Sequence, residues 1–130
     1  MQKQLMVLNR YLNRLAQDYN LYSTRYDMLS VICDNYPITL SNLATIQGIS
    51  LPSTSKTIDE LVNEGLVSRT RLDDDKRKCN VIPTSTGINK LRDIIDWNEN
   101  YWDSKLKYLS DQEQEQIEES LSILVDALLK

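Results

Sequence analysis

Hydroxyl-bearing and basic side chains gather in a short segment, ISLPSTSKT, at residues 49–57. The polar and conformationally fixed residues in it are Ser50, Pro52, Ser53, Ser55, Lys56 and Thr57. The hydroxyls can bond phosphates or base edges, the lysine can contact a phosphate or a guanine, and the proline can touch a thymine methyl. Short side chains also let a helix backbone approach its partner closely. The plain alternative is an ordinary helix with a capped N-terminus, and this segment taken alone favours that alternative.

A second cluster of charge lies at residues 73–78, DDDKRK, between two predicted strands at 66–72 and 79–82. Three adjacent Asp residues repel one another unless they have partners. We therefore predict that Asp75 pairs with Arg77 and holds it extended, so that Arg77 enters a narrow minor groove. The alternative is a solvated charged tip that keeps an edge hairpin from aggregating. The helix segment at residues 49–57 and this charged tip occur in the order and spacing of a DNA-binding unit, which favours the first interpretation.

Basic residues flank this tip as well. Arg69 and Arg71 alternate along the first predicted strand and share one of its faces. Lys76 lies between the predicted pair at the tip. Thr39 and Ser41, in the first turn of a preceding short helix, complete the residues that we expect to contact DNA.

Apolar residues spaced by three and four predict the elements that position these groups. The predicted helices cover residues 3–18, 24–36, 39–47 and 51–64, then about 84–109, and finally 110 onward. Thr39 and Ser50 are predicted N-caps, and Gly48 is the predicted left-handed turn between two short helices. In helix 39–47 the side chains expected to face inward are Leu40, Leu43, Ala44 and Ile46.

The order of these elements predicts a mainly α fold with a small β-hairpin wing. Two short helices joined by a tight glycine turn match a helix-turn-helix, whose second helix enters the major groove. A hairpin directly after that second helix is the arrangement of a winged helix-turn-helix.

Composition excludes several other classes of protein. The chain has 130 residues, of which 41% are hydrophobic and 26% charged, which suits one domain with one core. No apolar run is long enough for a membrane span, and the N-terminus lacks a signal peptide, so we expect a cytoplasmic protein without a membrane partner. Histidine is absent, which removes the commonest general base and metal ligand. We therefore expect neither an enzyme nor a metal or cofactor site.

The net charge of −4 hides an uneven distribution. Residues 1–37 carry net +1, residues 38–92 carry +2, and residues 93–130 carry −7. The acid therefore belongs to the C-terminal helices, whereas the predicted DNA-contacting segment is mildly basic. Weak positive charge predicts modest non-specific affinity, so binding would depend on well-placed contacts and on dimerisation.

These motifs resemble the MarR family of bacterial winged-helix transcription regulators. The resemblance is carried by Gly65-Leu66-Val67-Ser68-Arg69, by Pro52-Ser53-Thr54-Ser55-Lys56, and by Asp75-Lys76-Arg77 followed by Pro83-Thr84 and Gly87. It is strong over residues 21–91 and looser over the flanking helices. Two departures are Lys76 in place of the family's first wing arginine and Pro83 in place of a leucine. The lysine keeps the charge but loses the bidentate geometry of an arginine.

The resemblance implies a homodimer that binds a pseudo-palindromic operator in double-stranded DNA, and we expect a repressor. It implies one domain over residues 1–130, with dimerisation helices at 1–20 and 100–130 and a DNA reader at 21–92. Leucine stripes on both terminal helices independently exceed what one small core needs. The alternative function is a winged-helix module that binds another protein, such as another regulator, without binding DNA.

The resemblance also implies release by a small-molecule effector. The aromatic residues expected near its cleft are Tyr19, Tyr22, Tyr26, Trp97 and Tyr101. Aromatic residues at helical spacing serve more often in a core or an interface than in a pocket. Of the two cysteines, Cys33 lies on an apolar helical stripe, whereas Cys79 lies on the wing. There, Arg77 and Lys78 would lower its pKa, and a redox sensor is a minor hypothesis.

Overall fold

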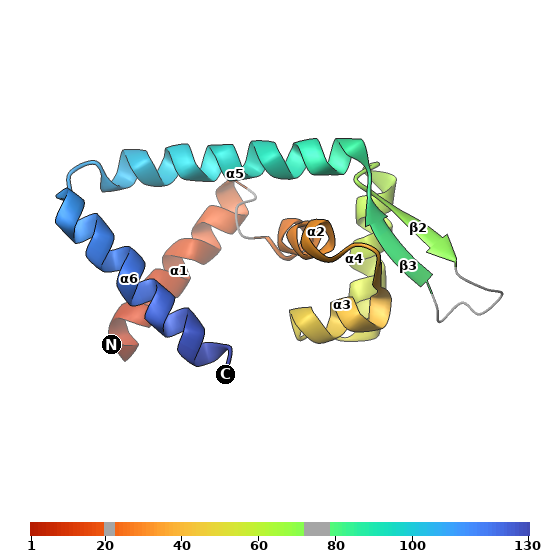
Figure 1. The fold of residues 1–130 in the computed structure, drawn as a ribbon, viewed down its shortest axis with the longest axis horizontal. Coiled ribbons are helices and arrows are strands. Elements are labelled where there is room, and N and C mark those ends of the chain that lie inside the picture. The colour runs from red at the N-terminus through yellow and green to blue at the C-terminus, as the bar shows by residue number, and fades with distance from the viewer. Residues whose placement is uncertain (20–22, 72–78) are drawn as a thin grey trace. The chain divides into compact units, whose positions relative to one another are not determined.

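A computed structural model describes residues 1–19, 23–71 and 79–130 of the chain. Its elements in order are α1 (Gln2–Tyr19), α2 (Thr24–Asn35), β1 (Ile38–Thr39), α3 (Leu40–Gln47), α4 (Leu51–Asn63), β2 (Val67–Arg71), β3 (Cys79–Pro83), α5 (Ser85–Leu106) and α6 (Asp111–Leu128) (Figure 1). The predicted fold class, mainly α with a small β wing, is confirmed. Within these three ranges no helix has the length and hydropathy to cross a membrane.

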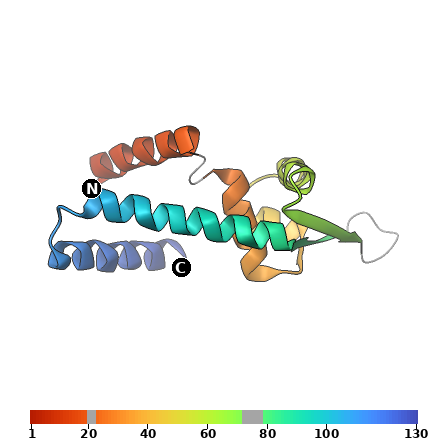
Figure 2. The ribbon, with the colours of Figure 1, turned by 90° about the horizontal axis from the view of Figure 1, so that it is seen from above.

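The chain divides into two compact units, residues 1–95 and residues 96–130. Helix α5 is continuous and contributes residues to both (Figure 2). The first unit holds α1 to β3 and the beginning of α5, and it therefore contains every residue predicted to contact DNA. The predicted domain boundaries at residues 1–20, 21–92 and 100–130 stay a prediction.

The core of the first unit lies between the three short helices and the sheet. Its fully buried members come from α2, α3, α4 and β3, and they are Met28, Leu29, Ile32, Leu43, Ile58, Leu61 and Val81. Leu66 and Val67 at the start of β2 close the same cluster. Burial of this many aliphatic side chains fixes α3 and α4 against the sheet, which is what a rigid reading element requires.

Local signals at the helix ends explain the helix-turn-helix geometry. The Thr39 hydroxyl accepts a hydrogen bond from the Asn42 amide at 3.1 Å, and it thereby caps α3. Gly48 ends α3 with a φ of 67°, a left-handed conformation that glycine adopts without strain. Ser50 then caps α4. The predicted caps and the predicted glycine turn are confirmed.

The sheet has one strand more than the two that the sequence predicts. The strand order is β1-β3-β2, and both neighbouring pairs are antiparallel. Ile38 of β1 lies opposite Val81 of β3. The pairing ties the residues before α3 to the wing, so the first helix of the helix-turn-helix and the wing share one sheet.

One expectation about α3 is wrong. The sequence predicts that Ile46 faces inward, but it is 56% exposed. Successive residues turn by about 100°, which places position 47 rather than 46 on the arc of Leu43 and Ala44. Gln47 is half-buried there, and its side-chain amide donates to the Asp27 carboxylate at 2.9 Å.

The second unit consists of the C-terminal part of α5 and of α6. The side chain of Ser110 and that of Glu113 each accept a hydrogen bond from the other's backbone amide, so the two residues form a capping box at the start of α6. Gln114 donates to the Leu106 carbonyl at 2.9 Å and fastens α6 to the end of α5. None of the residues of α6 is buried. Helix α5 ends at Leu106, whereas the sequence predicts an end near residue 109.

Candidate nucleic-acid interface

Helix α4 has one buried side and one polar side. Thr54, Ile58 and Leu61 are fully buried at positions i, i+4 and i+7. Lys56 is exposed and makes no ion pair within the described part of the chain. Its side chain is therefore available for an external partner.

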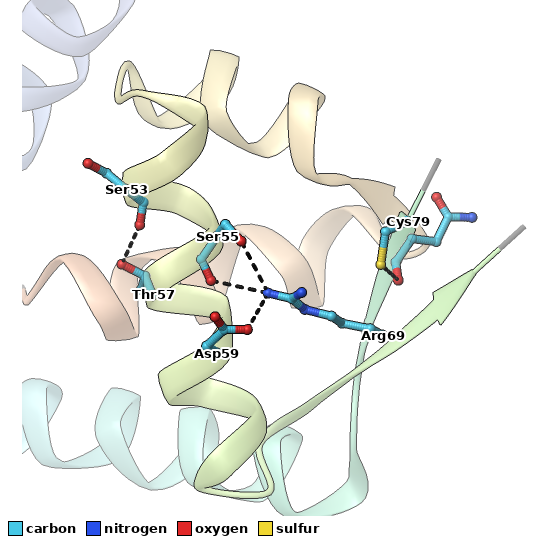
Figure 3. Close-up of polar contacts among 7 residues, drawn as sticks. Ser53, Ser55, Thr57, Asp59, Arg69 and Cys79 are labelled. Carbon is cyan, nitrogen blue, oxygen red and sulfur yellow. Dashed lines mark hydrogen bonds and ion pairs between the residues drawn. The ribbon is translucent and has the colours of Figure 1, made fainter. Parts of the chain in front are cut away.

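Hydroxyl groups at the start of α4 are already partly used by the helix itself. Thr54 donates to the Ser50 carbonyl at 2.9 Å. Thr57 donates to the Ser53 carbonyl at 3.1 Å (Figure 3). Because each hydroxyl has one hydrogen, these two threonines can only accept further hydrogen bonds. Ser50 donates to the Ser53 hydroxyl oxygen at 2.9 Å, which leaves the hydrogen of Ser53 free. Ser53 can therefore donate a hydrogen bond to a phosphate.

Arg69 reaches from β2 across to α4. Its Nη2 donates to the Asp59 carboxylate at 2.6 Å and to the Ser55 carbonyl at 3.1 Å, and it lies 3.5 Å from the Ser55 hydroxyl (Figure 3). Since β2 is a wing strand, this arginine fixes the wing to the predicted reading helix. It also offsets the negative charge of Asp59, which would otherwise repel a phosphate.

Asp59 is a residue of this candidate interface that the sequence analysis missed. A local signal exists, because Asp59 follows Ser55 by one helical turn and so shares its side of α4. Its partner Arg69 lies ten residues further on and in another element, and only the packing of β2 on α4 brings the two together. Arg69 itself is predicted as a DNA contact; it takes part in this intramolecular pair, and its contact with DNA stays a prediction.

The root of the wing is fastened to the start of α5. The Thr84 hydroxyl donates to the Gly65 carbonyl at 2.6 Å and accepts from the Gly87 amide at 3.0 Å. The Thr84 amide donates to the Leu66 carbonyl at 3.0 Å. A Cβ added at Gly87 would lie 1.9 Å from that same carbonyl oxygen, so only glycine fits this contact. These contacts join the residues between α4 and β2 to the beginning of α5.

Of the remaining predicted DNA contacts, the structure describes the side chains of some and not of others. Thr39 is half-buried as the cap of α3, whereas Ser41 and Pro52 are exposed. Arg71 pairs with Cys79 in the sheet, but its side chain lies outside what is described. The wing-tip residues predicted to matter most, namely Asp75, Lys76 and Arg77, lie outside the described residues and stay predictions.

Of the residues predicted for the effector site, Tyr26 lies in the first unit and its side chain is described. The Arg25 guanidinium lies 5.1 Å and the Lys90 ammonium 5.7 Å from the centre of its ring. Arg25 also pairs with Glu64 at the end of α4. Tyr22, like the side chain of Tyr19, lies outside the described residues.

Trp97 and Tyr101 belong to the second unit. Their rings stack with centroids 5.4 Å apart and planes inclined by 14°. Tyr101 also meets Trp102 edge to face, with ring centroids 5.5 Å apart. Each ring is thus part of an aromatic cluster within α5, which fits a packing role for aromatic residues at helical spacing. The effector site stays a prediction.

The two cysteines differ in their surroundings. Cys79 is 6% exposed and its thiol contacts the Asn80 carbonyl oxygen at 3.7 Å. Cys33 is half-buried, and burial, assisted by the carboxylate of Asp34, raises the pKa of its thiol. A raised pKa lowers the thiolate fraction and with it the reactivity of Cys33. Within the described ranges no group of Cys, Asp and Glu residues is arranged to hold a metal ion.

Taken together, α3 and α4 with the β2–β3 hairpin form a winged helix-turn-helix. The sequence matches the profile of the MarR family over residues 21–79, which covers α2 to the start of β3. This segment is therefore similar to the winged helix-turn-helix domain of the MarR family. A comparison with curated proteins gives no match.

Solved structures share this fold over nearly the whole chain. A MarR protein from Peptoclostridium difficile DA00132 is 22% identical, with 97% of this chain and 85% of that chain covered and a TM-score of 0.73. A MarR family transcriptional regulator from Silicibacter pomeroyi DSS is 25% identical, with coverages of 97% and 85% and a TM-score of 0.65. FabT of Streptococcus pneumoniae, solved in complex with DNA, is 18% identical, with coverages of 99% and 96% and a TM-score of 0.73.

Proposed function

We propose that the chain is a dimeric, sequence-specific DNA-binding regulator of transcription. The single observation that carries the proposal is the polar side of α4, where Lys56 and the Ser53 hydroxyl are free to contact a partner. In a helix-turn-helix this helix lies in the major groove. Support also comes from FabT, whose fold is similar and which was solved in complex with DNA.

The wing has a separate role in this proposal. Arg69 holds β2 against α4, so the hairpin tip would meet the DNA at a fixed distance from the reading helix. Arg77 would enter the minor groove beside the site of α4, with Asp75 as its partner. Arginine in a narrow minor groove favours A/T-rich sequence.

Dimerisation is supported by apolar residues on the terminal helices. In α6 the large hydrophobic residues that remain exposed are Ile117, Leu121, Ile123, Val125 and Leu128. In α1 they are Leu5, Met6, Val7 and Leu8. Exposed large apolar residues in this number are typical of an interface, and a second copy is the occupant that would also supply two readers for a pseudo-palindromic site.

We further propose repression by occupancy of a site that overlaps a promoter. A small ligand bound near Tyr26 would change the separation of the two readers and release the DNA. The continuous α5 supports such coupling, because the Thr84 and Gly87 contacts join its beginning rigidly to the wing. A regulator of this kind works where the DNA is, which in a bacterial cell is the cytoplasm.

Selection from a pool of random duplexes tests the proposal. We expect enrichment of an inverted repeat with half-sites about one helical turn apart. Arg77→Ala should still bind the repeat but lose the preference for A/T-rich flanks. Failure to enrich any sequence, together with binding that is insensitive to salt, would contradict DNA reading and favour the protein-binding module instead.

A further inference from the structure

Leu51 is a half-exposed apolar residue at the start of the predicted reading helix. It is the first residue of α4 and is 49% exposed, and it does not belong to the core cluster. Its neighbours along the chain are the cap Ser50 and the exposed Pro52. A half-exposed leucine next to a serine cap contributes little to the fold, so its side chain is free for contact with a partner.

The position of Leu51 on α4 identifies the face to which it belongs. Residues turn by about 100° along a helix, so positions 51, 52, 55, 56 and 59 fall within an arc of about 140°. That arc lies beside the buried arc of Thr54, Ile58 and Leu61, and it includes Lys56 and the Arg69-bound Asp59. Side chains of a helix lean toward its N-terminus, which carries Leu51 to the leading end of this face.

The major groove of duplex DNA offers one apolar group to such a side chain. The C5-methyl of thymine projects into the groove, whereas the other base edges present hydrogen-bond donors and acceptors. We propose that Leu51 determines specificity by packing against a thymine methyl in each half-site. This inference rests on the proposed function, because it assumes that α4 lies in the major groove.

Deoxyuridine provides a direct test, because it pairs as thymine does but lacks the methyl group. Each thymine of the duplex selected above is replaced in turn, in both half-sites, and affinities are measured for the wild type and for Leu51→Ala. We expect one thymine at which the replacement weakens wild-type binding about fourfold for each half-site changed. Leu51→Ala should bind the thymine and deoxyuridine duplexes equally at that position.

Val62→Ala is the matched control. Val62 lies on the same side of α4, three turns from Leu51, and is 37% exposed. Val62→Ala should lose affinity by the same factor as the wild type when the thymine methyl is removed. Leu51→Met preserves an apolar side chain of similar volume, so it should show most of the wild-type loss of affinity when the methyl is removed. Circular dichroism and urea midpoints of all three variants report whether the fold is intact.

Two results would overturn the inference, and they are distinguishable. If Leu51→Ala loses affinity on methyl removal at the same thymine and by the same factor as the wild type, another group reads the methyl, while DNA binding stands. If methyl removal never weakens the wild type, no such contact exists. Absence of any selected duplex would overturn the proposed function and this inference together.

Discussion

Gly87→Ala tests whether the wing root and α5 are joined as tightly as the structure indicates. The new Cβ would lie 1.9 Å from the Leu66 carbonyl oxygen and 2.9 Å from its carbon, whereas ordinary contact begins at 3.4 Å. The oxygen would have to retreat by about 1.5 Å. It cannot do so freely, because it accepts a hydrogen bond from the Thr84 amide and Leu66 is only 4% exposed.

The expected magnitude follows from three contributions. Overpacking against backbone costs about 3 kcal/mol, the upper part of the usual range. Loss of the Thr84–Leu66 hydrogen bond adds about 1 kcal/mol. Alanine is about 1 kcal/mol better than glycine within a helix, which acts in the opposite direction. We therefore expect Gly87→Ala to lower the free energy of unfolding by about 3 kcal/mol, and the Tm by about 10 °C.

Urea and thermal unfolding at one fixed protein concentration are the assays, because dimerisation would make the midpoint depend on concentration. Thr86→Ala is the control, since Thr86 is exposed in the same helical turn. Its free energy of unfolding should change by less than about 0.5 kcal/mol. A Gly87→Ala protein as stable as the wild type, or more stable, would refute the argument that this contact admits only glycine.

Three further predictions concern the site and its supports. Arg69→Ala should change the free energy of unfolding by less than about 1 kcal/mol, because the ion pair with Asp59 is partly exposed. The same variant should weaken duplex binding about tenfold, because the negative charge of Asp59 is then no longer offset. Adding Asp59→Asn to the Arg69→Ala protein should recover part of that affinity in gel shift. Equal duplex affinity of Arg69→Ala and the wild type would contradict the inference that Arg69 offsets the charge of Asp59. Thr84→Val should lower the free energy of unfolding in urea by about 1–2 kcal/mol, because the Gly65 carbonyl and Gly87 amide lose their partner. Because the pKa of the Cys33 thiol is raised, Cys33 should react with iodoacetamide with a higher pH midpoint in the folded protein than in urea, and a lower midpoint in the folded protein would contradict the raised pKa.

Local chemistry made much of the reading helix predictable. Ser50 caps α4, Pro52 lies in its first turn, and Thr54, Ile58 and Leu61 mark its buried side, all of which are encoded within one short segment. The two wing strands could be predicted from side chains that alternate between the strand faces and from the charged segment that separates the strands. These features depend on neighbours a few residues apart, which is the range over which a single sequence carries information.

Contacts between elements could not be predicted in the same way. The Arg69–Asp59 pair depends on how β2 lies on α4, and the Gly87–Leu66 contact depends on where α5 begins. Strand β1 has two residues, too few to show a period, and its Thr39 is already explained as a helix cap. The prediction for Ile46 is wrong because it followed the apolar character of the residue, whereas the turn of about 100° per residue places Gln47 on the inward arc, where its amide bonds to Asp27.

The salt dependence of duplex binding tests the central claim that α4 meets DNA. Fluorescence anisotropy would give the affinity of the wild type and of Lys56→Ala for the selected duplex over a range of NaCl concentrations. Each phosphate contact contributes about 0.9 to the slope of log affinity against log salt. We predict a steep negative slope for the wild type and one shallower by about 1.8 for Lys56→Ala, since a dimer loses two lysines. A flat wild-type slope, or an identical slope for both proteins, would contradict the account.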